Sequence, residues 1–232
     1  MANYDEAILR RRTLQPAAPF PILHQAVRIA LYDEYAARAF YRRVVEVFGA
    51  QPPFVNIARA EEQHVAALGR LCQRYGIPRP LDPFPAETTV SPSWRANLER
   101  AVAGEIANVR LYGYLRPHVA ARDVQQTFAN LQAASLDNHL PAFQHALQLA
   151  LAREGYHAAQ GIPASQAYVR HGPLTNILEH GFSLLASQHS VFGLVGSLVR
   201  AAHPAMLAGM AAGGSAVHYL RKRGQVSHPM EE

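Results

Sequence analysis

The sequence predicts an all-α protein. Apolar residues recur at intervals of three and four along four long segments of the chain, as they do on one face of a helix. Prolines and glycines, which interrupt helices, gather between those segments. No alternating run of β-branched and aromatic residues lasts more than a few positions, so strands are not expected. Two helical hairpins joined by a longer connection are the usual plan of a four-helix bundle with one crossover.

The first hairpin is predicted from two helices, at residues 22–48 and 54–75. Gly49 ends the first helix, and two prolines follow before the second helix begins. Gly76 and Pro78 end the second helix. Both helices carry ionisable side chains inside their apolar stripes: Glu34 in the first, and Glu61 and His64 in the second.

The second hairpin is predicted from helices at residues 93–118 and 123–153, after a proline-rich connection at residues 78–92. Glu105 lies in the apolar stripe of the third helix, and His139 lies in that of the fourth. The fourth helix also contains Pro141. Because proline has no N–H to donate and its ring collides with the carbonyl four residues earlier, this helix is predicted to bulge there.

The two hairpins resemble each other, which indicates an internal duplication. A glutamate precedes a tyrosine by seven residues in the first and third helices, as Glu34 and Tyr41 and as Glu105 and Tyr112. The second helix contains FVNIARAEEQH and the fourth contains FANLQAASLDNH, which share Phe, Asn and Ala at a constant offset. This offset aligns Glu61 with Ser135, whereas His64 and His139 are one residue out of phase. Duplicated hairpins bury their repeated positions around a pseudo-twofold axis.

The ionisable residues inside the stripes predict a metal site. Glu61 and His64 are three residues apart on a helix, so they can present an oxygen and a nitrogen to one point. Glu34 and Glu105 lie mid-stripe on their own helices. Three buried carboxylates repel one another, and each loses hydration worth several kcal/mol. A compensating cation is therefore expected, and oxygen and imidazole ligands suit one or two iron or manganese ions, and zinc less specifically.

The alternative is that these carboxylates are partly exposed at the edge of each stripe. An arginine such as Arg38 or Arg110 would then pair with them. For four other acids this surface position is the preferred interpretation, because they lie on polar helix faces: Asp33, Glu46, Glu62 and Glu99.

The same segments resemble the ferritin-like superfamily, in particular rubrerythrin-type domains and a bacterial group of largely uncharacterised ferritin-like proteins. EYAARAFY, FVNIARAEEQH, AGEIANVRLY and NHLPAF carry the resemblance, which covers residues 20–155. It implies a ferritin-like four-helix bundle with a dinuclear iron or manganese centre that handles dioxygen, peroxide or iron itself. By motif, the metal ligands that it implies are Glu34, Glu61, His64, Glu105 and His139.

The chain departs from the family pattern at two positions. Leu136 stands where the family has a glutamate three residues before the fourth-helix histidine, and Asn108 stands where rubrerythrins carry a second third-helix carboxylate. A bulge near Pro141 would turn Asp137 or Ser135 inward. With three carboxylates against two divalent ions, a mononuclear or an inactive site is the alternative. Further candidates for ligands or their hydrogen-bond partners are Asp137, Ser135, Asn108, Tyr41 and Tyr112. The two tyrosines could also be ordinary core residues.

Composition limits the other functions. Cys72 is the one cysteine among 232 residues, which excludes an intramolecular disulfide and cysteine-based zinc or iron–sulfur sites, so any electron donor must be a separate molecule. Basic residues cluster only at 10–12 and 221–223, and we expect no nucleic-acid partner. The N-terminus has charges and prolines where a signal peptide needs an apolar stretch, which predicts a cytoplasmic location.

Residues 156–232 are expected to form an additional helical extension. The segment 174–223 is rich in small residues and has few charges. It is expected to pack on the bundle or on a neighbouring subunit of a homo-oligomer, and the alternative is contact with a membrane.

Two functions follow from these observations. The first is a metal-binding protein with a di-iron or di-manganese carboxylate centre, an oxidoreductase of the ferroxidase or peroxidase type that acts in iron oxidation or handling or in peroxide or dioxygen reduction. The alternative is a non-catalytic helical bundle with a degenerate metal site, which serves as an assembly or membrane-attached scaffold.

Overall fold

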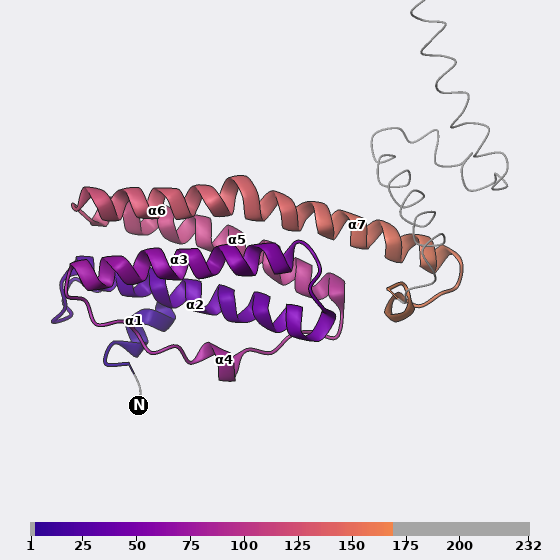
Figure 1. Ribbon diagram of the computed structural model, residues 1–232, viewed down its shortest axis with the longest axis horizontal. Coiled ribbons are helices and arrows are strands. Elements are labelled where there is room, and N and C mark those ends of the chain that lie inside the picture. Colours follow the sequence, from indigo (N-terminus) through magenta and orange to yellow (C-terminus); the bar gives the residue numbers. More distant parts are fainter. Residues whose placement is uncertain (1–2, 169–232) are drawn as a thin grey trace, which may run out of the picture. The chain divides into compact units, whose positions relative to one another are not determined.

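The computed structural model describes residues 3–168, and every regular element in that range is helical (Figure 1). The all-α prediction is therefore confirmed for this part of the chain. Four long rods dominate it: α2 (Ile22–Phe48), α3 (Phe54–Arg74), α5 (Trp94–Leu115), and a fourth rod made of α6 (Arg122–Ala134), the π-helical turn η2 (Ser135–His139) and α7 (Leu140–Ala159).

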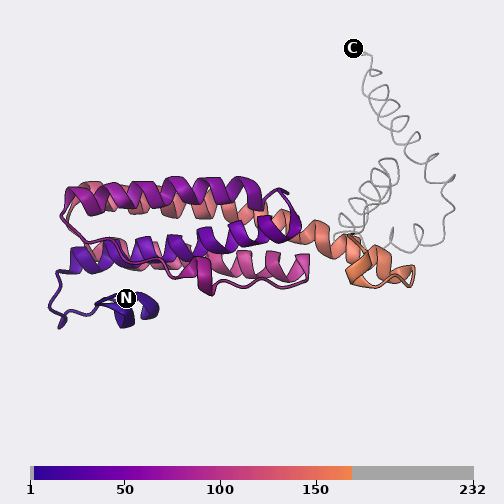
Figure 2. The same ribbon diagram turned by 60° about the horizontal axis from the view of Figure 1, so that its bottom comes forward.

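The four rods pack side by side, and together they are called the bundle below. The helix α2 packs against α3 and α5, and α6 packs against α5 and α3. Figure 2 shows the resulting arrangement, in which α2 and α5 lie in one layer and α3 and the fourth rod lie in the other. All four rods therefore present one face to a common interior.

The rod boundaries agree closely with the predicted ones. The first helix begins and ends as expected, and the third is followed by a 3₁₀ turn at Arg116–His118. The fourth rod differs, because α7 continues past the domain boundary expected at residues 155 and 156. Beyond α7, the Tyr168 hydroxyl donates a hydrogen bond to Glu154 over 2.8 Å, so the chain stays packed on that helix.

Two short helices were not expected from the sequence, α1 (Glu6–Arg11) and α4 (Phe84–Glu87). Helices this short display no apolar periodicity from which to predict them. The buried guanidinium of Arg28 in α2 ties the N-terminal segment down: it donates to both oxygens of Asp5, over 2.7 and 2.6 Å, and to the carbonyl of Pro78. The packed unit therefore begins well before residue 20.

The interior of the bundle contains two apolar clusters. One includes Leu31, Leu68 and Phe128, and the other includes Phe54 and Phe143. On α3, α5 and the fourth rod, buried polar residues lie in sequence between members of the two clusters: Glu61 and His64, Glu105 and Asn108, and Ser135 and His139. On α2, Asp33 and Glu34 lie at the end of the first cluster, next to its last member Tyr35. A polar layer therefore separates the two halves of the apolar core.

The segment expected to contact a membrane or another subunit, residues 174–223, lies outside the described residues. Within residues 3–168, none of the helices combines the length and the apolar character needed to cross a membrane.

Candidate metal centre

The polar layer of the bundle brings together the carboxylates that were predicted to lie in the apolar stripes. Glu34 is 1% exposed, and Glu61 and Glu105 are each 2% exposed. Arg38, a candidate surface partner, instead pairs with Asp82 over 2.7 Å. The three carboxylates are therefore core residues, and the alternative of partly exposed carboxylates paired with arginines does not describe them.

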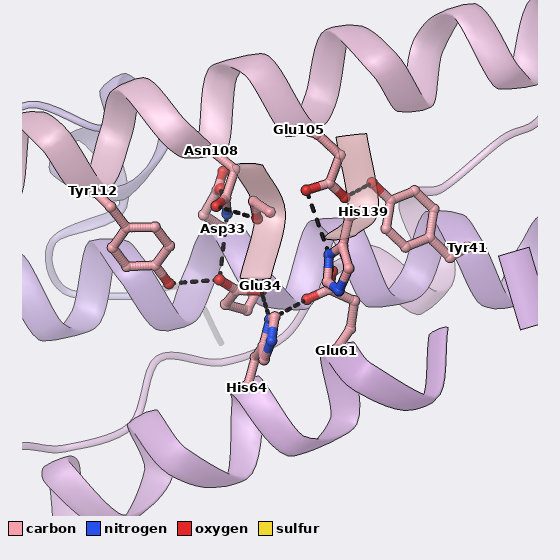
Figure 3. A network of polar contacts seen from close by, with 10 residues as sticks. Asp33, Glu34, Tyr41, Glu61, His64, Glu105, Asn108, Tyr112 and His139 are labelled. Carbon is pink, nitrogen blue, oxygen red and sulfur yellow. Dashed lines mark hydrogen bonds and ion pairs between the residues drawn. The ribbon is translucent and has the colours of Figure 1, made fainter. Parts of the chain in front are cut away.

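Glu61 lies at the middle of the layer, between two histidines (Figure 3). Its Oε2 atom is 3.0 Å from Nδ1 of His64, and its Oε1 atom is 3.3 Å from Nδ1 of His139. Glu34 Oε2 lies 3.4 Å from the same nitrogen of His64, and Glu105 Oε2 lies 3.5 Å from that of His139. The Glu61 carboxylate thus belongs to two groups of side chains, and each group also contains one other glutamate and one histidine.

Each group has the spacing of a metal site. One ligand atom from each of Glu34, Glu61 and His64 lies within 4.8 Å of the other two, and the same is true of Glu61, Glu105 and His139. The two imidazole rings are stacked, with centroids 5.4 Å apart and planes inclined by 21°. The structure therefore places all five residues implied as ligands in one layer of the bundle.

The π-helical turn η2 explains the one-residue phase difference between the two histidines. A π turn closes with an i→i+5 bond, so it takes in an extra residue relative to an α-helix. Ser135 and His139 are both buried, although they are four positions apart in the sequence. Glu61 and His64 are three positions apart. The bulge predicted from Pro141 is confirmed. It turns Ser135 inward and leaves Asp137 exposed, outside both groups.

Each of the two tyrosines donates a hydrogen bond to a glutamate of the other hairpin. The hydroxyl of Tyr41 in α2 donates to Glu105 Oε1 in α5 over 2.6 Å, and that of Tyr112 in α5 donates to Glu34 Oε1 in α2 over 2.5 Å. Each phenol thus bonds the glutamate of the other helix, because α2 and α5 run antiparallel. This exchange matches the pseudo-twofold relation expected from the repeat, and both tyrosines contact proposed ligands.

Asn108 connects the layer to Asp33, which was not among the residues expected at the site. Its amide nitrogen donates to Asp33 over 3.1 Å and to Glu34 over 3.3 Å, and its oxygen accepts from Ser135 over 2.9 Å. Asp33 was expected on a polar face, but it is buried, and Arg12 pairs with it over 2.6 Å. In the sequence, only the adjacency of Asp33 to Glu34 indicated that it could be buried. The N-terminal segment that covers Asp33 has no periodic pattern from which this contact could be predicted.

Charge in the layer is balanced by protons. Burial tends to lower the histidine pKa values, but the facing carboxylates outweigh it and raise the pKa of His64 to about 10 and that of His139 to about 9. Burial and repulsion from Glu61 raise the pKa of Glu34. The pKa of Glu61 is lowered despite its burial, because Glu34 hydrogen-bonds to it and both histidines face it. A proton in this pair is therefore favoured on Glu34, and Glu61 is favoured as the charged carboxylate.

The residues present fit metal ions. Among the described residues, Nδ1 of buried His139 has no partner with hydrogen-bond geometry, although two carboxylates lie within 3.5 Å of it. A metal ion held by these three side chains would give this nitrogen the well-directed partner that it lacks. Carboxylate oxygens with imidazole nitrogens are ligands that iron and manganese accept.

No family model, curated protein or solved structure matches this chain.

Proposed function

We propose that this chain is a ferritin-like four-helix metalloprotein whose buried centre binds two iron or manganese ions. The observation that carries the proposal is the position of Glu61, whose two oxygens face two different histidines. Glu61 would therefore be a ligand in both groups. The positive charge would offset the cost of burying three carboxylates in one layer.

Each residue has a definite role in this proposal. Glu34 and His64 would hold one ion together with Glu61, and Glu105 and His139 would hold the other with it. The phenols of Tyr41 and Tyr112 orient the terminal glutamates by donating hydrogen bonds to them. The bound ions supply activation of dioxygen or peroxide. We propose iron oxidation or handling, or peroxide or dioxygen reduction, as the activity, with electrons from a separate donor.

A second function is favoured by Ser135. The repeat aligns this serine with Glu61, and its hydroxyl bonds Asn108 rather than offering a charge to the centre. One carboxylate fewer would weaken the binding of the second ion. A non-catalytic bundle with a degenerate site, used for assembly or membrane attachment, is the function that this substitution supports.

Metal analysis of the full chain, purified without chelators and then titrated anaerobically with ferrous ion, tests both functions. We expect about two equivalents per chain under the first, since two ligand groups are present. Glu61→Gln should lose most of this metal. Glu62→Gln is the matched control, because the neighbouring Glu62 is exposed and pairs with Arg42.

The outcomes separate the two functions. If no ion binds after anaerobic loading, the metalloprotein proposal is wrong. If ions bind but the loaded protein consumes neither dioxygen nor peroxide, the oxidoreductase part is wrong and the degenerate-site function is supported. Equal metal loss in Glu61→Gln and Glu62→Gln would remove the assignment of the ligands.

A further inference from the structure

A pocket of about 350 Å³ lies between α2 and α5 and reaches the centre from outside. Glu61 and Glu105 line its inner end. Part of its wall is made of small side chains, which leave this space unfilled: Ala36, Ala37, Ala103 and Gly104. The pocket therefore connects the surface with two proposed ligands through a gap that the sequence leaves unfilled.

Two arginines stand at the outer end of this pocket, and they differ in how they are held. The guanidinium of Arg100 lies 4.0 Å from the ring centroid of Phe40 and donates to the Thr89 carbonyl over 2.7 Å, so it is anchored away from the carboxylates. Arg12 instead pairs with Asp33 over 2.6 Å. The Arg12 side chain is 42% exposed and that of Asp33 is 7% exposed, so the pair joins solvent to the pocket wall.

The charges along the pocket suit a cation that moves inward. Asp33, which pairs with the exposed Arg12, lines the same pocket as the buried Glu61 and Glu105, so three carboxylates line the space between the Arg12 side chain and the centre. In the structure, Arg12 neutralises the outermost of these carboxylates. Because the Arg12 side chain is 42% exposed, it can turn into solvent when a cation takes over its role beside the buried Asp33.

We propose that this pocket is the path by which a divalent cation reaches the centre, with Asp33 as the carboxylate that binds it first and Arg12 as a displaceable block. The inference rests on the proposed metal-binding function. It assigns to Asp33 and Arg12 an effect on the rate of metal binding that is separate from the ligands themselves.

Stopped-flow binding of cobalt(II) to the full chain, followed by its absorbance at fixed ionic strength, tests the path. Arg12→Gly is the main variant, since Arg12 has a φ of 53°, which glycine adopts without strain. Removing the blocking charge should raise the association rate constant by about 3–10-fold. The control is Arg11→Gly, which removes the same charge from an exposed neighbour outside the pocket, and it should change the rate less than about twofold.

A second variant tests the role of Asp33. In the Arg12→Gly background, Asp33→Asn should slow association again by about 3–10-fold, because the first carboxylate is lost. A purely structural ion pair predicts no such reversal, since both changes would act through lost stability. Arg12→Lys, which keeps a positive charge at the mouth, should stay near the wild-type rate.

Failure of the path and failure of the centre give different results. If wild-type protein binds no cobalt at equilibrium, the centre and the path are both wrong. If about two equivalents bind but Arg12→Gly and Arg11→Gly give equal rates, only the path is overturned. An Arg12→Gly/Asp33→Asn protein as fast as Arg12→Gly would likewise remove Asp33 from the path.

Discussion

Glu61 differs from the other buried carboxylates because each of its oxygens faces a separate histidine. Glu34 and Glu105 each use one oxygen to accept a phenol hydrogen bond and direct the other toward a histidine. The terminal glutamates are thereby fixed by the protein. Among the described residues, no phenol donates to Glu61, and each of its oxygens faces an imidazole, so it is suited to be a ligand in both groups.

The phenol of Tyr112 should matter for metal affinity. Tyr112→Phe removes the 2.5 Å hydrogen bond to Glu34 and leaves that oxygen with the longer bond from Asn108. Loss of such a partner typically weakens metal binding by about 10–100-fold, and we expect a loss near the lower limit because Asn108 remains. Equilibrium titration with manganese measures it.

Tyr4→Phe is the matched control for that change. Tyr4 is exposed and contacts Arg28 and Phe20 through its ring, which phenylalanine retains. The Tyr4→Phe protein should bind manganese with the same affinity as the wild type. Equal affinities for Tyr112→Phe and the wild type would show that Tyr112 is an ordinary core residue.

The fourth rod shows how one element adapts to the site. Its α-helical parts are joined by the η2 turn, in which Leu136 is 48% exposed while Ser135 and His139 are buried. In an uninterrupted α-helix, the residue three positions before His139 would lie on the same face. The motif pattern therefore predicts that Leu136 is the inward-facing residue. The turn transfers the inward position to Ser135.

This transfer predicts the outcome of restoring a carboxylate. Ser135→Glu should place a fourth glutamate in the layer and tighten binding of the second ion by about tenfold or more, as an added charged ligand does. The metal-free protein should become less stable, by roughly 1–3 kcal/mol, because an additional charge is buried. Calorimetric titration and urea unfolding in chelator measure the two effects.

Leu136→Glu is the control for the restored carboxylate. It adds the same charge one residue later, on the exposed side of the turn. Metal affinity and stability should both stay near wild type. Tighter binding in Leu136→Glu than in Ser135→Glu would mean that the helix is not bulged in the metal-bound protein.

The packed unit as a whole is divided by its polar layer. Two apolar clusters lie on either side, and the buried Arg28–Asp5 pair attaches the N-terminal segment to one of them. Without metal, the raised pKa values of His64 and His139 favour protonated imidazoles beside the carboxylates of the layer, and the raised pKa of Glu34 favours its neutral form. Global stability should therefore depend on pH in a direction that metal reverses.

Metal-free protein should lose stability as pH rises above neutrality. The folded-state pKa values of His64 and His139, about 10 and about 9, exceed the ordinary value of 6.5. A histidine with a raised pKa makes its full contribution to folding stability below pH 6.5, and this contribution is lost as the pH rises through the folded-state pKa. Between pH 6.5 and 9.5 the free energy of unfolding should fall by up to roughly 6 kcal/mol for the two histidines together, measured by urea unfolding in chelator.

Metal-loaded protein should behave in the opposite way. The ligands must be deprotonated to bind, so binding tightens and stabilises the fold as pH rises. Urea unfolding with saturating manganese over the same pH range measures this. Parallel pH profiles with and without metal would show that the two histidines are not ligands.

Periodicity was sufficient to place the four rods and to identify the glutamates and histidines of the layer, because helical spacing is a local property that the chain carries residue by residue. The same reasoning put Asp33 on a polar face, since its burial depends on the N-terminal segment, which folds over α2 from elsewhere in the chain. Packing also selected Ser135 over Asp137 and paired each tyrosine with the glutamate of the opposite hairpin. Contacts between segments distant in sequence depend on how helices cross and where one bulges, and only the assembled core defines those.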